Sequence, residues 1–386
     1  MVRNIFISVA RIFCIAAAIL AMATGCATSG RAVIAKEIHG SVRTGWNEVY
    51  RVDRFRVGWY DSAKNLETPE RLAKSGFDSV MPYSSNCTIQ EVLAFLAASH
   101  QAGIAVHLEI PRARVTDPTG VSLEEYIRAT SGSQAVLGWY LFDEPELKYE
   151  ARPKLLKAAY FRVKTLDPAR KVAIVFVLPN LSGAYRDSMD SLWIDYYPVT
   201  RRSREFASLR CGRYADRMKA YGRWADRYQL PLTLVLQGFG ESKDGKPQFW
   251  HRLPTPAETL YMFWASLLAR PVEIMYWTLY RCHEDWFQKA LSPVIGKFRK
   301  MFPDTVEYWP SEGFALSGGR ADFVLLGNGQ GQLWLLLLNR EGKERNLVIE
   351  APYPYVFRNG TAAGSDKTRC ATGPYGVLLL EISKIR

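Results

Sequence analysis

The stretch that decides the fold reads Gly138-Trp139-Tyr140-Leu141-Phe142-Asp143-Glu144-Pro145-Glu146. Its apolar and aromatic run predicts a strand buried on both faces, and Pro145 ends that strand. Where parallel strands alternate with helices, the carboxyl ends of the strands carry the active site, so Asp143 and Glu144 are candidate catalytic residues. A structural alternative exists. Asp143 can cap a helix that begins at Pro145, with the neighbouring acids complementing the helix dipole.

Strands and helices alternate eight times between residues 53 and 304. Eight alternations in about 250 residues predict an α/β fold of the (β/α)₈ TIM-barrel type. An open, doubly wound sheet is the alternative, but it requires a glycine-rich phosphate loop after the first strand, and residues 61–64 (Asp-Ser-Ala-Lys) form no such loop. The expected strands cover residues 55–61, 77–83, 104–110, 136–144, 172–178, 191–198, 232–240 and 272–280.

The pattern changes after residue 304. Short apolar runs are separated by Gly, Asn and Lys turns, and no helical periodicity lies between them. This predicts a small all-β domain over residues 305–386, of the sandwich type.

The N-terminus carries a targeting segment over residues 1–25. Two arginines precede the apolar run 12–22, and the small residues 23–25 precede Cys26. This pattern resembles the signal of bacterial lipoproteins, which implies a lipid on Cys26 that anchors the mature chain to a membrane of the cell envelope, on the periplasmic or surface side. The alternatives are a secretory signal cleaved near residues 23–25 and an uncleaved anchor. All three place the folded part outside the cytoplasm, and residues 26–52 are expected to form a tether.

Composition narrows the partners. The chain has 50 Lys and Arg against 38 Asp and Glu, but no nucleic-acid-binding signature accompanies the excess, so we expect no nucleic-acid partner. The basic residues in 201–204 and 210–227 are best explained by a solvated helix face; the alternative is attraction to anionic lipid or an acidic polysaccharide. His251 and His283 have no third ligand at metal spacing, and we expect neither a metal nor a cofactor. Eleven Trp and 20 Tyr suit stacking against sugar rings or a large aromatic core.

Polar and aromatic side chains lie at the ends of four expected strands. Side-chain alternation directs Glu144 of the fourth strand toward the mouth of a barrel. By the same alternation Asp195 and Tyr197 share a face of the sixth strand, while Gln237 belongs to the seventh and Trp277 to the eighth. Such an arrangement predicts a ring of polar groups around a stacking platform.

Four motifs occur in order on these strands. They are Asp143-Glu144-Pro145, Asp195-Tyr196-Tyr197-Pro198, Arg252-Leu253-Pro254-Thr255-Pro256 and Tyr276-Trp277. With them, residues 52–305 resemble the clan A glycoside hydrolases, in particular members with Asp-Glu-Pro at the fourth strand, many of which carry a C-terminal β domain.

The resemblance implies a glycosidase that cleaves a bond of a poly- or oligosaccharide with Glu144 as the general acid. Asp143 beside it would raise the pKa of that acid, as its task requires. Trp277 would stack on the sugar, and Tyr197 and Gln237 would bind its hydroxyls. Two further aromatic residues are candidates for substrate binding, Tyr276 and Trp59.

The chain departs from the family at two places. The family has Asn before the acid and a nucleophilic Glu at the end of the seventh strand, where this chain has Asp143 and Gln237. Hydrolysis normally needs two carboxylates, about 5 Å apart for retention and about 6.5–9.5 Å apart for inversion. If none reaches Glu144, the chain is a carbohydrate-binding barrel without catalysis. The candidates for the second carboxylate are Glu241, Asp195, Asp61, Glu109 and Glu284.

Overall fold

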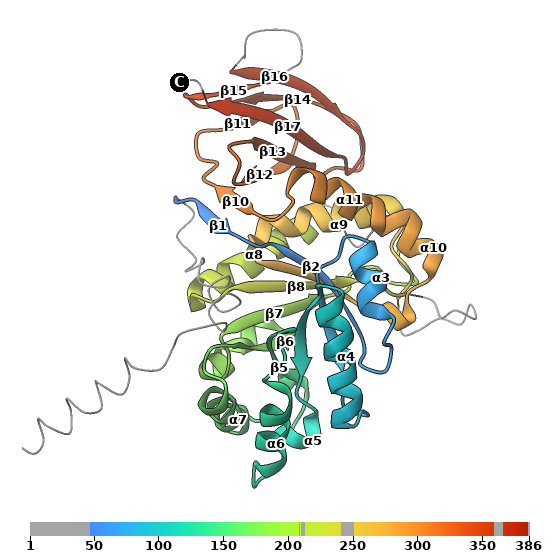
Figure 1. The fold of residues 1–386 in the computed structure, drawn as a ribbon. Helices are drawn as coiled ribbons and strands as arrows, with labels where there is room; N and C mark the ends of the chain where they lie inside the picture. Colours follow the sequence, from blue (N-terminus) through green and yellow to red (C-terminus); the bar gives the residue numbers. More distant parts are fainter. Residues whose placement is uncertain (1–46, 208, 210–212, 241–250, 359–365, 385–386) are drawn as a thin grey trace, which may run out of the picture. The chain divides into compact units, whose positions relative to one another are not determined.

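The computed structural model describes residues 47–207, 209, 213–240, 251–358 and 366–384. Within these ranges, eight parallel strands close into a barrel in sequence order, from β2 to β9 (Figure 1). The closed barrel confirms the fold predicted from the sequence. Its strands are β2 (Arg56–Ser62), β3 (Ser79–Tyr83), β4 (Ala105–Glu109), β5 (Val136–Asp143), β6 (Lys171–Phe176), β7 (Ser191–Tyr196), β8 (Leu232–Gln237) and β9 (Glu273–Trp277).

Helices follow most of the strands. Two of them begin with a capping box, in which the hydroxyl of Thr88 or Thr255 accepts a hydrogen bond from the backbone of a glutamate three residues later. The connection from β6 to β7 is a 3₁₀ segment, η2 (Pro179–Ser188), instead of an α-helix. The α-helices are α3 (Thr68–Lys74), α4 (Ile89–Gln101), α5 (Arg112–Val115), α6 (Val121–Thr130), α7 (Pro153–Leu166), α8 (Arg213–Tyr228), α9 (Pro256–Ser266), α10 (Glu284–Trp286) and α11 (Ser292–Met301).

Side-chain alternation divides the strand residues between two apolar clusters. Tyr60, Tyr140 and Trp193 pack inside the barrel with other inward-facing residues. Trp59 and Tyr276 belong instead to the large cluster between the strands and the helices, where their ring centroids are 5.3 Å apart. The barrel interior is therefore a filled aromatic core below its mouth.

Two antiparallel sheets follow the barrel and confirm the all-β character predicted for the C-terminal part. Residues 50–52, which the sequence assigned to the tether, form β1 and pair with β10, so they belong to the larger sheet. Leu335 of one sheet and Leu347 of the other belong to a common apolar core. The larger sheet has the order β1 (Tyr50–Val52), β10 (Val306–Trp309), β12 (Ala321–Gly327), β13 (Leu333–Asn339), β17 (Val377–Lys384), β15 (Tyr355–Phe357), and the smaller β11 (Ala315–Ser317), β14 (Arg345–Glu350), β16 (Lys367–Thr372).

The β sheets and the barrel share apolar and ionic contacts. Leu326 and Leu338 of the larger sheet belong to the same buried cluster as the outer face of the barrel. Lys219 of α8 pairs with Asp322 of β12. In the part of the chain that the structure describes, no helix combines the length and apolar character needed to cross a membrane. Cys26 lies outside the described residues.

Candidate active site

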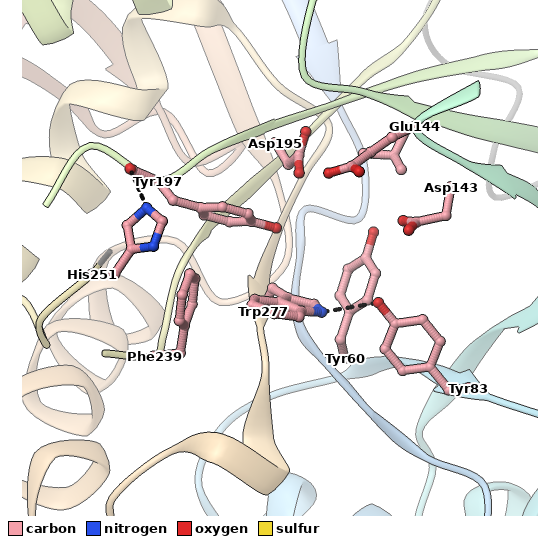
Figure 2. A pocket seen from close by; sticks show the side chains of 10 residues that line it. Tyr60, Tyr83, Asp143, Glu144, Asp195, Tyr197, Phe239, His251 and Trp277 are labelled. Atoms are coloured by element: carbon pink, nitrogen blue, oxygen red, sulfur yellow. Dashed lines mark hydrogen bonds between the residues drawn. The ribbon is translucent and has the colours of Figure 1, made fainter. Parts of the chain in front are cut away.

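A cavity of about 350 Å³ lies at the carboxyl ends of the barrel strands (Figure 2). Five residues that the sequence singled out contribute to its wall: three acids, one tyrosine and one tryptophan. The cavity thus gathers groups from six of the barrel strands and from the loops that follow them. Its lining is Tyr60, Tyr83, Asp143, Glu144, Val175, Asp195, Tyr197, Phe239, His251 and Trp277.

Glu144 follows β5 directly and has a left-handed backbone conformation, with φ 50° and ψ 57°. Its backbone N–H donates to the carbonyl oxygen of Val175 on β6, over 3.1 Å, which fixes this turn to the neighbouring strand. A left-handed conformation costs a residue other than glycine roughly 1–3 kcal/mol, and such residues cluster at functional sites. The turn directs the carboxyl into the cavity (Figure 2).

The carboxyls of Glu144 and Asp195 lie within hydrogen-bonding reach of each other, and Figure 2 shows the first turned toward the second. Asp195 is only 5% exposed, and its Oδ1 has no hydrogen-bond donor among the described residues. Two carboxylates in contact repel unless a proton lies between them, so the pair holds a proton that separate acids would lose.

The environment raises the pKa of both acids. Burial raises the pKa of Asp195 well above its ordinary value, and the charges of Glu144 and Asp143 raise it further. Burial also raises the pKa of Glu144; the charge of Asp143 adds to this effect, and the ammonium of Lys148 opposes it. The charge of Asp143 thus favours the protonated form of Glu144.

Asp143 is held by two partners, and neither acid of the motif caps a helix. The hydroxyl of Tyr140 donates to Asp143 Oδ1 over 2.6 Å, and Lys148 Nζ lies 3.3 Å from Oδ2. The short 3₁₀ segment η1 (Pro145–Leu147) receives no side-chain cap. The capping alternative for Asp143 is not what the structure shows.

Aromatic rings form one wall of the cavity. The ring of Tyr197 stacks on Trp277, with centroids 5.6 Å apart and an interplanar angle of 27°. Phe239 meets the same indole edge-on at 4.5 Å. The indole Nε1 donates to the hydroxyl of Tyr83 over 2.9 Å, which fixes the plane of the ring across the mouth. The result is a rigid apolar surface beside the carboxyl pair.

Gln237 does not line the cavity. Its side chain is 1% exposed, and its Oε1 accepts from the backbone N–H of Val199 over 2.9 Å. Its Nε2 donates to the carbonyl oxygens of Val199, Phe239 and Arg252 over 3.0, 3.1 and 2.8 Å. These bonds use the donors of the amide, so the hydroxyl contact expected from the sequence is not available. Gln237 holds the loops after β7 and β8 together.

The Arg-x-Pro-Thr-Pro motif also has a structural role. Arg252 donates two hydrogen bonds to the buried carboxylate of Glu258, over 2.7 and 2.8 Å. Glu258 is the residue that completes the capping box of Thr255 at the start of α9. The motif therefore fixes the loop that carries a backbone acceptor for Gln237.

Several predicted residues lie away from the cavity. Trp59 and Tyr276 face the helices, because alternation turns them outward from the barrel. Asp61 is buried and accepts from Thr68 and Asn65 in its own loop. Glu241 lies outside the described residues.

The two remaining acids are also engaged elsewhere. Glu109 accepts from the backbone and side chains of Ser84 and Ser85. Glu284 pairs with Arg71. Of the candidates for the second carboxylate that the structure describes, Asp195 alone reaches Glu144.

Five lining residues were not selected from the sequence, namely Tyr60, Tyr83, Val175, Phe239 and His251. Phe239 shares the alternation of Gln237, and Tyr60 shares that of the inward-facing positions of its strand, so a signal for both existed. Tyr83 lies at the end of the second strand, and His251 lies in a long loop, where no periodicity applies. Among the described residues, no group of His, Cys, Asp and Glu side chains has the geometry to hold a metal ion.

Neither a protein-family model nor a curated protein matches the sequence. The structure is similar to a beta-galactosidase from Rahnella sp. R3, with a TM-score of 0.56 and 9% identity over 86% of this chain and 99% of that one. It is also similar to a GH27 β-L-arabinopyranosidase from Geobacillus stearothermophilus, with a TM-score of 0.54 and 10% identity over 86% of this chain and 98% of that one. At these identities the similarity shows the fold alone. The chain has the barrel fold of glycoside hydrolases.

Proposed function

We propose that the protein hydrolyses a glycosidic bond of a poly- or oligosaccharide, with Glu144 as the general acid. One observation carries the proposal: the carboxyl of Glu144 is held against that of Asp195 inside a cavity at the carboxyl ends of the barrel strands. A general acid must keep its proton near neutral pH, and burial together with the charge of Asp143 raises the pKa of Glu144 in that direction.

The aromatic wall of the cavity supports a sugar as the ligand. Flat aromatic faces bind the C–H faces of sugar rings through apolar contact, while hydroxyls need hydrogen-bonding groups at the rim. Trp277, Tyr197 and Phe239 supply the first, and the acids with the hydroxyls of Tyr60 and Tyr83 supply the second. The strained backbone of Glu144 fits a position kept for chemistry.

A second candidate function is carbohydrate binding without hydrolysis. The observation that favours it is Gln237, because the end of the seventh strand holds an amide clamped by backbone groups in place of an acid. In that case the cavity would bind a sugar and release it unchanged.

We further propose that the protein acts outside the cytoplasm, anchored through a lipid on Cys26. The support is the sequence of residues 1–26 alone. Expression of the full chain in a bacterium, followed by mass measurement of the mature N-terminal peptide, tests the proposal. A diacylglyceryl group on Cys26, absent in Cys26→Ser, is expected; an unmodified cysteine would contradict the anchor.

The test of hydrolysis compares Glu144→Gln with the parent on aryl glycosides and on oligosaccharides. A variant without the acid should lose about 100-fold or more in kcat/KM on substrates with poor leaving groups. It should lose far less on a dinitrophenyl glycoside, whose leaving group departs without a proton. A defect independent of the leaving group would contradict the role of Glu144 as an acid.

Glu146→Gln is the matched control. Glu146 lies two residues away and does not line the cavity; its Oε1 accepts from the backbone N–H groups of Val177 and Leu178, which a glutamine oxygen can replace. This variant should keep activity close to that of the parent. If neither the parent nor the control releases sugar, while both bind one oligosaccharide saturably, the binding function is the correct one.

A further inference from the structure

The spacing of the acids does not fit hydrolysis by two carboxylates. In retaining enzymes the nucleophile stands about 5–5.5 Å from the acid, and in inverting enzymes the base stands about 6.5–9.5 Å away, with a water between. The carboxyls of Glu144 and Asp195 are in hydrogen-bonding contact, which is closer than either arrangement. No anomeric carbon and no water fits between them.

No other acid among the described residues stands across the cavity from Glu144. Asp143 precedes it in the chain and is bound by Tyr140 and Lys148. The end of the seventh strand presents the clamped amide of Gln237. The described part of the site therefore supplies a proton donor and no enzymic nucleophile.

We propose that the substrate is a β-linked 2-acetamido-2-deoxy sugar, that its own acetamide oxygen is the nucleophile, and that Asp195 accepts the acetamide N–H. The inference rests on the proposed hydrolysis at Glu144 and adds to it the substrate class and the source of the nucleophile. A β-linked sugar of this kind carries its acetamide on the face opposite the leaving group, as displacement at the anomeric carbon requires.

The cavity complements an acetamide group. The amide N–H needs a buried acceptor, and Asp195 Oδ1 is such an atom, enclosed and without a donor among the described residues. The amide oxygen needs a donor to orient it. The hydroxyl of Tyr60, on a side chain 2% exposed, lies within hydrogen-bonding reach of Tyr140 and points toward the acids (Figure 2).

The methyl group of the acetamide also finds a complementary surface. It needs an apolar wall, and the rings of Trp277, Tyr197 and Phe239 provide one next to Asp195. A buried polar group left unpaired is unfavourable, so a ligand that pairs Asp195 while filling the apolar wall gains on both counts.

Binding of the amide also delivers the proton to the correct acid. In the free protein one proton lies between Glu144 and Asp195. When an amide N–H donates to Asp195, the aspartate is stabilised in its charged form. The proton then remains on Glu144, beside the glycosidic oxygen. The contact between the two acids, which excludes a direct two-carboxylate mechanism, thus becomes a means of protonating the general acid.

The reaction then proceeds in two balanced steps. The acetamide oxygen forms a bond to C1 as the bond from C1 to the leaving oxygen breaks, and the proton of Glu144 passes to that oxygen. The resulting cyclic cation is stabilised by the charge of Asp195 at its N–H. In the second step water attacks C1, gives its proton to the carboxylate of Glu144, and the bond from C1 to the acetamide oxygen breaks. The acetamide is restored and the configuration is retained.

The experiment compares methylumbelliferyl β-glycosides that differ only at C2, the acetamido sugar against its 2-hydroxy counterpart, in the gluco and galacto series. Chitin and cellulose oligosaccharides extend the comparison to natural linkages. We expect kcat/KM to favour the acetamido sugar by at least 100-fold. Mono-, di- and trifluoroacetamido substrates should react progressively more slowly, because fluorine weakens the carbonyl oxygen as a nucleophile. If the acetamide took no part in the reaction, the rate would not fall steadily with the number of fluorine atoms.

Two outcomes overturn the inference while leaving hydrolysis intact. One is equal or better cleavage of the 2-hydroxy sugars. The other is a covalent glycosyl adduct on any carboxylate of the protein after incubation with a 5-fluoro glycosyl fluoride of the acetamido sugar, detected by peptide mass. Absence of cleavage for every glycoside and oligosaccharide in the set contradicts both the hydrolysis and the inference.

Asp195→Asn provides the residue-level test. It should lose at least 100-fold on the acetamido sugar and should lose the dependence on fluorine, because the amide is no longer oriented. Full activity of this variant with the fluorine series unchanged would overturn the role of Asp195.

Discussion

Two buried carboxyls inside the same barrel have opposite surroundings. Glu273, at the amino-terminal end of β9, is 3% exposed; His107 Nε2 lies 2.8 Å from its Oε2, and the hydroxyl of Ser79 donates to its Oε1 over 2.7 Å. Asp195, at the carboxyl end of β7, is 5% exposed and is surrounded by Glu144 and Asp143. Burial alone therefore does not set the pKa of an acid in this barrel; its partners do.

The pKa directions express this difference. Burial tends to raise the pKa of Glu273, but the charge and hydrogen bond of His107, the hydroxyl of Ser79 and the charge of Arg56 outweigh it, so its pKa is lowered. Burial raises the pKa of Asp195, the charges of Glu144 and Asp143 raise it further, and the hydrogen bond with Tyr197 only partly opposes them. At the closed end of the barrel, Glu273 has partners that satisfy its charge, whereas at the open end two further acids lie beside Asp195.

The largest effect on stability is expected from removing the partner of Glu273 at the closed end of the barrel. His107→Leu removes the main partner of the buried Glu273 carboxylate, which should cost about 3–5 kcal/mol of unfolding free energy. Denaturant unfolding measures the loss. His107→Gln, which can still donate a hydrogen bond, should lose less. Equal stability of the leucine variant and the parent would show that the pair contributes nothing.

An acid introduced at the end of the seventh strand should harm the fold without adding a nucleophile. In Gln237→Glu, a carboxylate faces the carbonyl oxygens of Val199, Phe239 and Arg252 and cannot donate to them, at a cost of about 1–3 kcal/mol. Thermal unfolding checks the loss against Gln90→Glu, an exposed position in the first turn of α4. A gain in hydrolysis by Gln237→Glu would show that this site lacks only a strand-seven acid.

Neutralising the unsatisfied acid should stabilise the protein. The folded-state pKa of Asp195 is raised, so the folded protein holds its proton more tightly than the unfolded chain, and stability falls as the pH rises above the ordinary pKa of about 3.9. Asp195→Asn avoids this loss and should gain on the order of 1 kcal/mol at pH 7–8, with the difference vanishing below about pH 4.

The control for Asp195→Asn is an aspartate with the opposite shift. Hydrogen bonds from Thr119 and Ser122 lower the pKa of Asp117, so its charge stabilises the fold above its ordinary pKa. Asp117→Asn should therefore lower the melting temperature at neutral pH. Thermal unfolding of both variants at several pH values measures the two slopes, and slopes of the same sign would contradict the assignment of Asp195.

The smallest effects concern the pH profile. Asp143 raises the pKa of Glu144 and Lys148 lowers it. Activity that requires the protonated acid is lost as the pH rises through that pKa, so Asp143→Asn should move the basic limb of kcat/KM to lower pH. Lys148→Met should move it to higher pH, each by on the order of half a pH unit. If the basic limbs of the Asp143→Asn and Lys148→Met profiles moved in the same direction, the charge assignment would be contradicted.

The sequence predicts the barrel because its signals are local. The apolar run that ends at Asp143 and the capping residues Thr88 and Thr255 depend only on neighbours along the chain. Strand β1 lacked such a signal, since its short strand is defined by pairing with β10, more than 250 residues away.

The candidate site can be predicted only in part. Alternation places Glu144, Asp195, Tyr197 and Trp277 at the mouth, and all four line the cavity. It also placed Gln237 there, because no pattern in the chain reveals the backbone carbonyls that occupy its amide. Contact between the two acids depends on the left-handed turn at Glu144, which no pattern in the sequence reveals.

Because the backbone at Glu144 is left-handed, the residue preferred at this position depends on the property for which variants are selected. Glycine or asparagine adopts φ 50° at little cost, and either would also remove a negative charge from beside Asp195. In a library of random variants screened for heat resistance alone, replacements at position 144 should rise early. In a library screened for sugar release, the glutamate should persist against that drift. Comparison of the residues found at position 144 in the two libraries would show whether stability or activity favours the carboxyl.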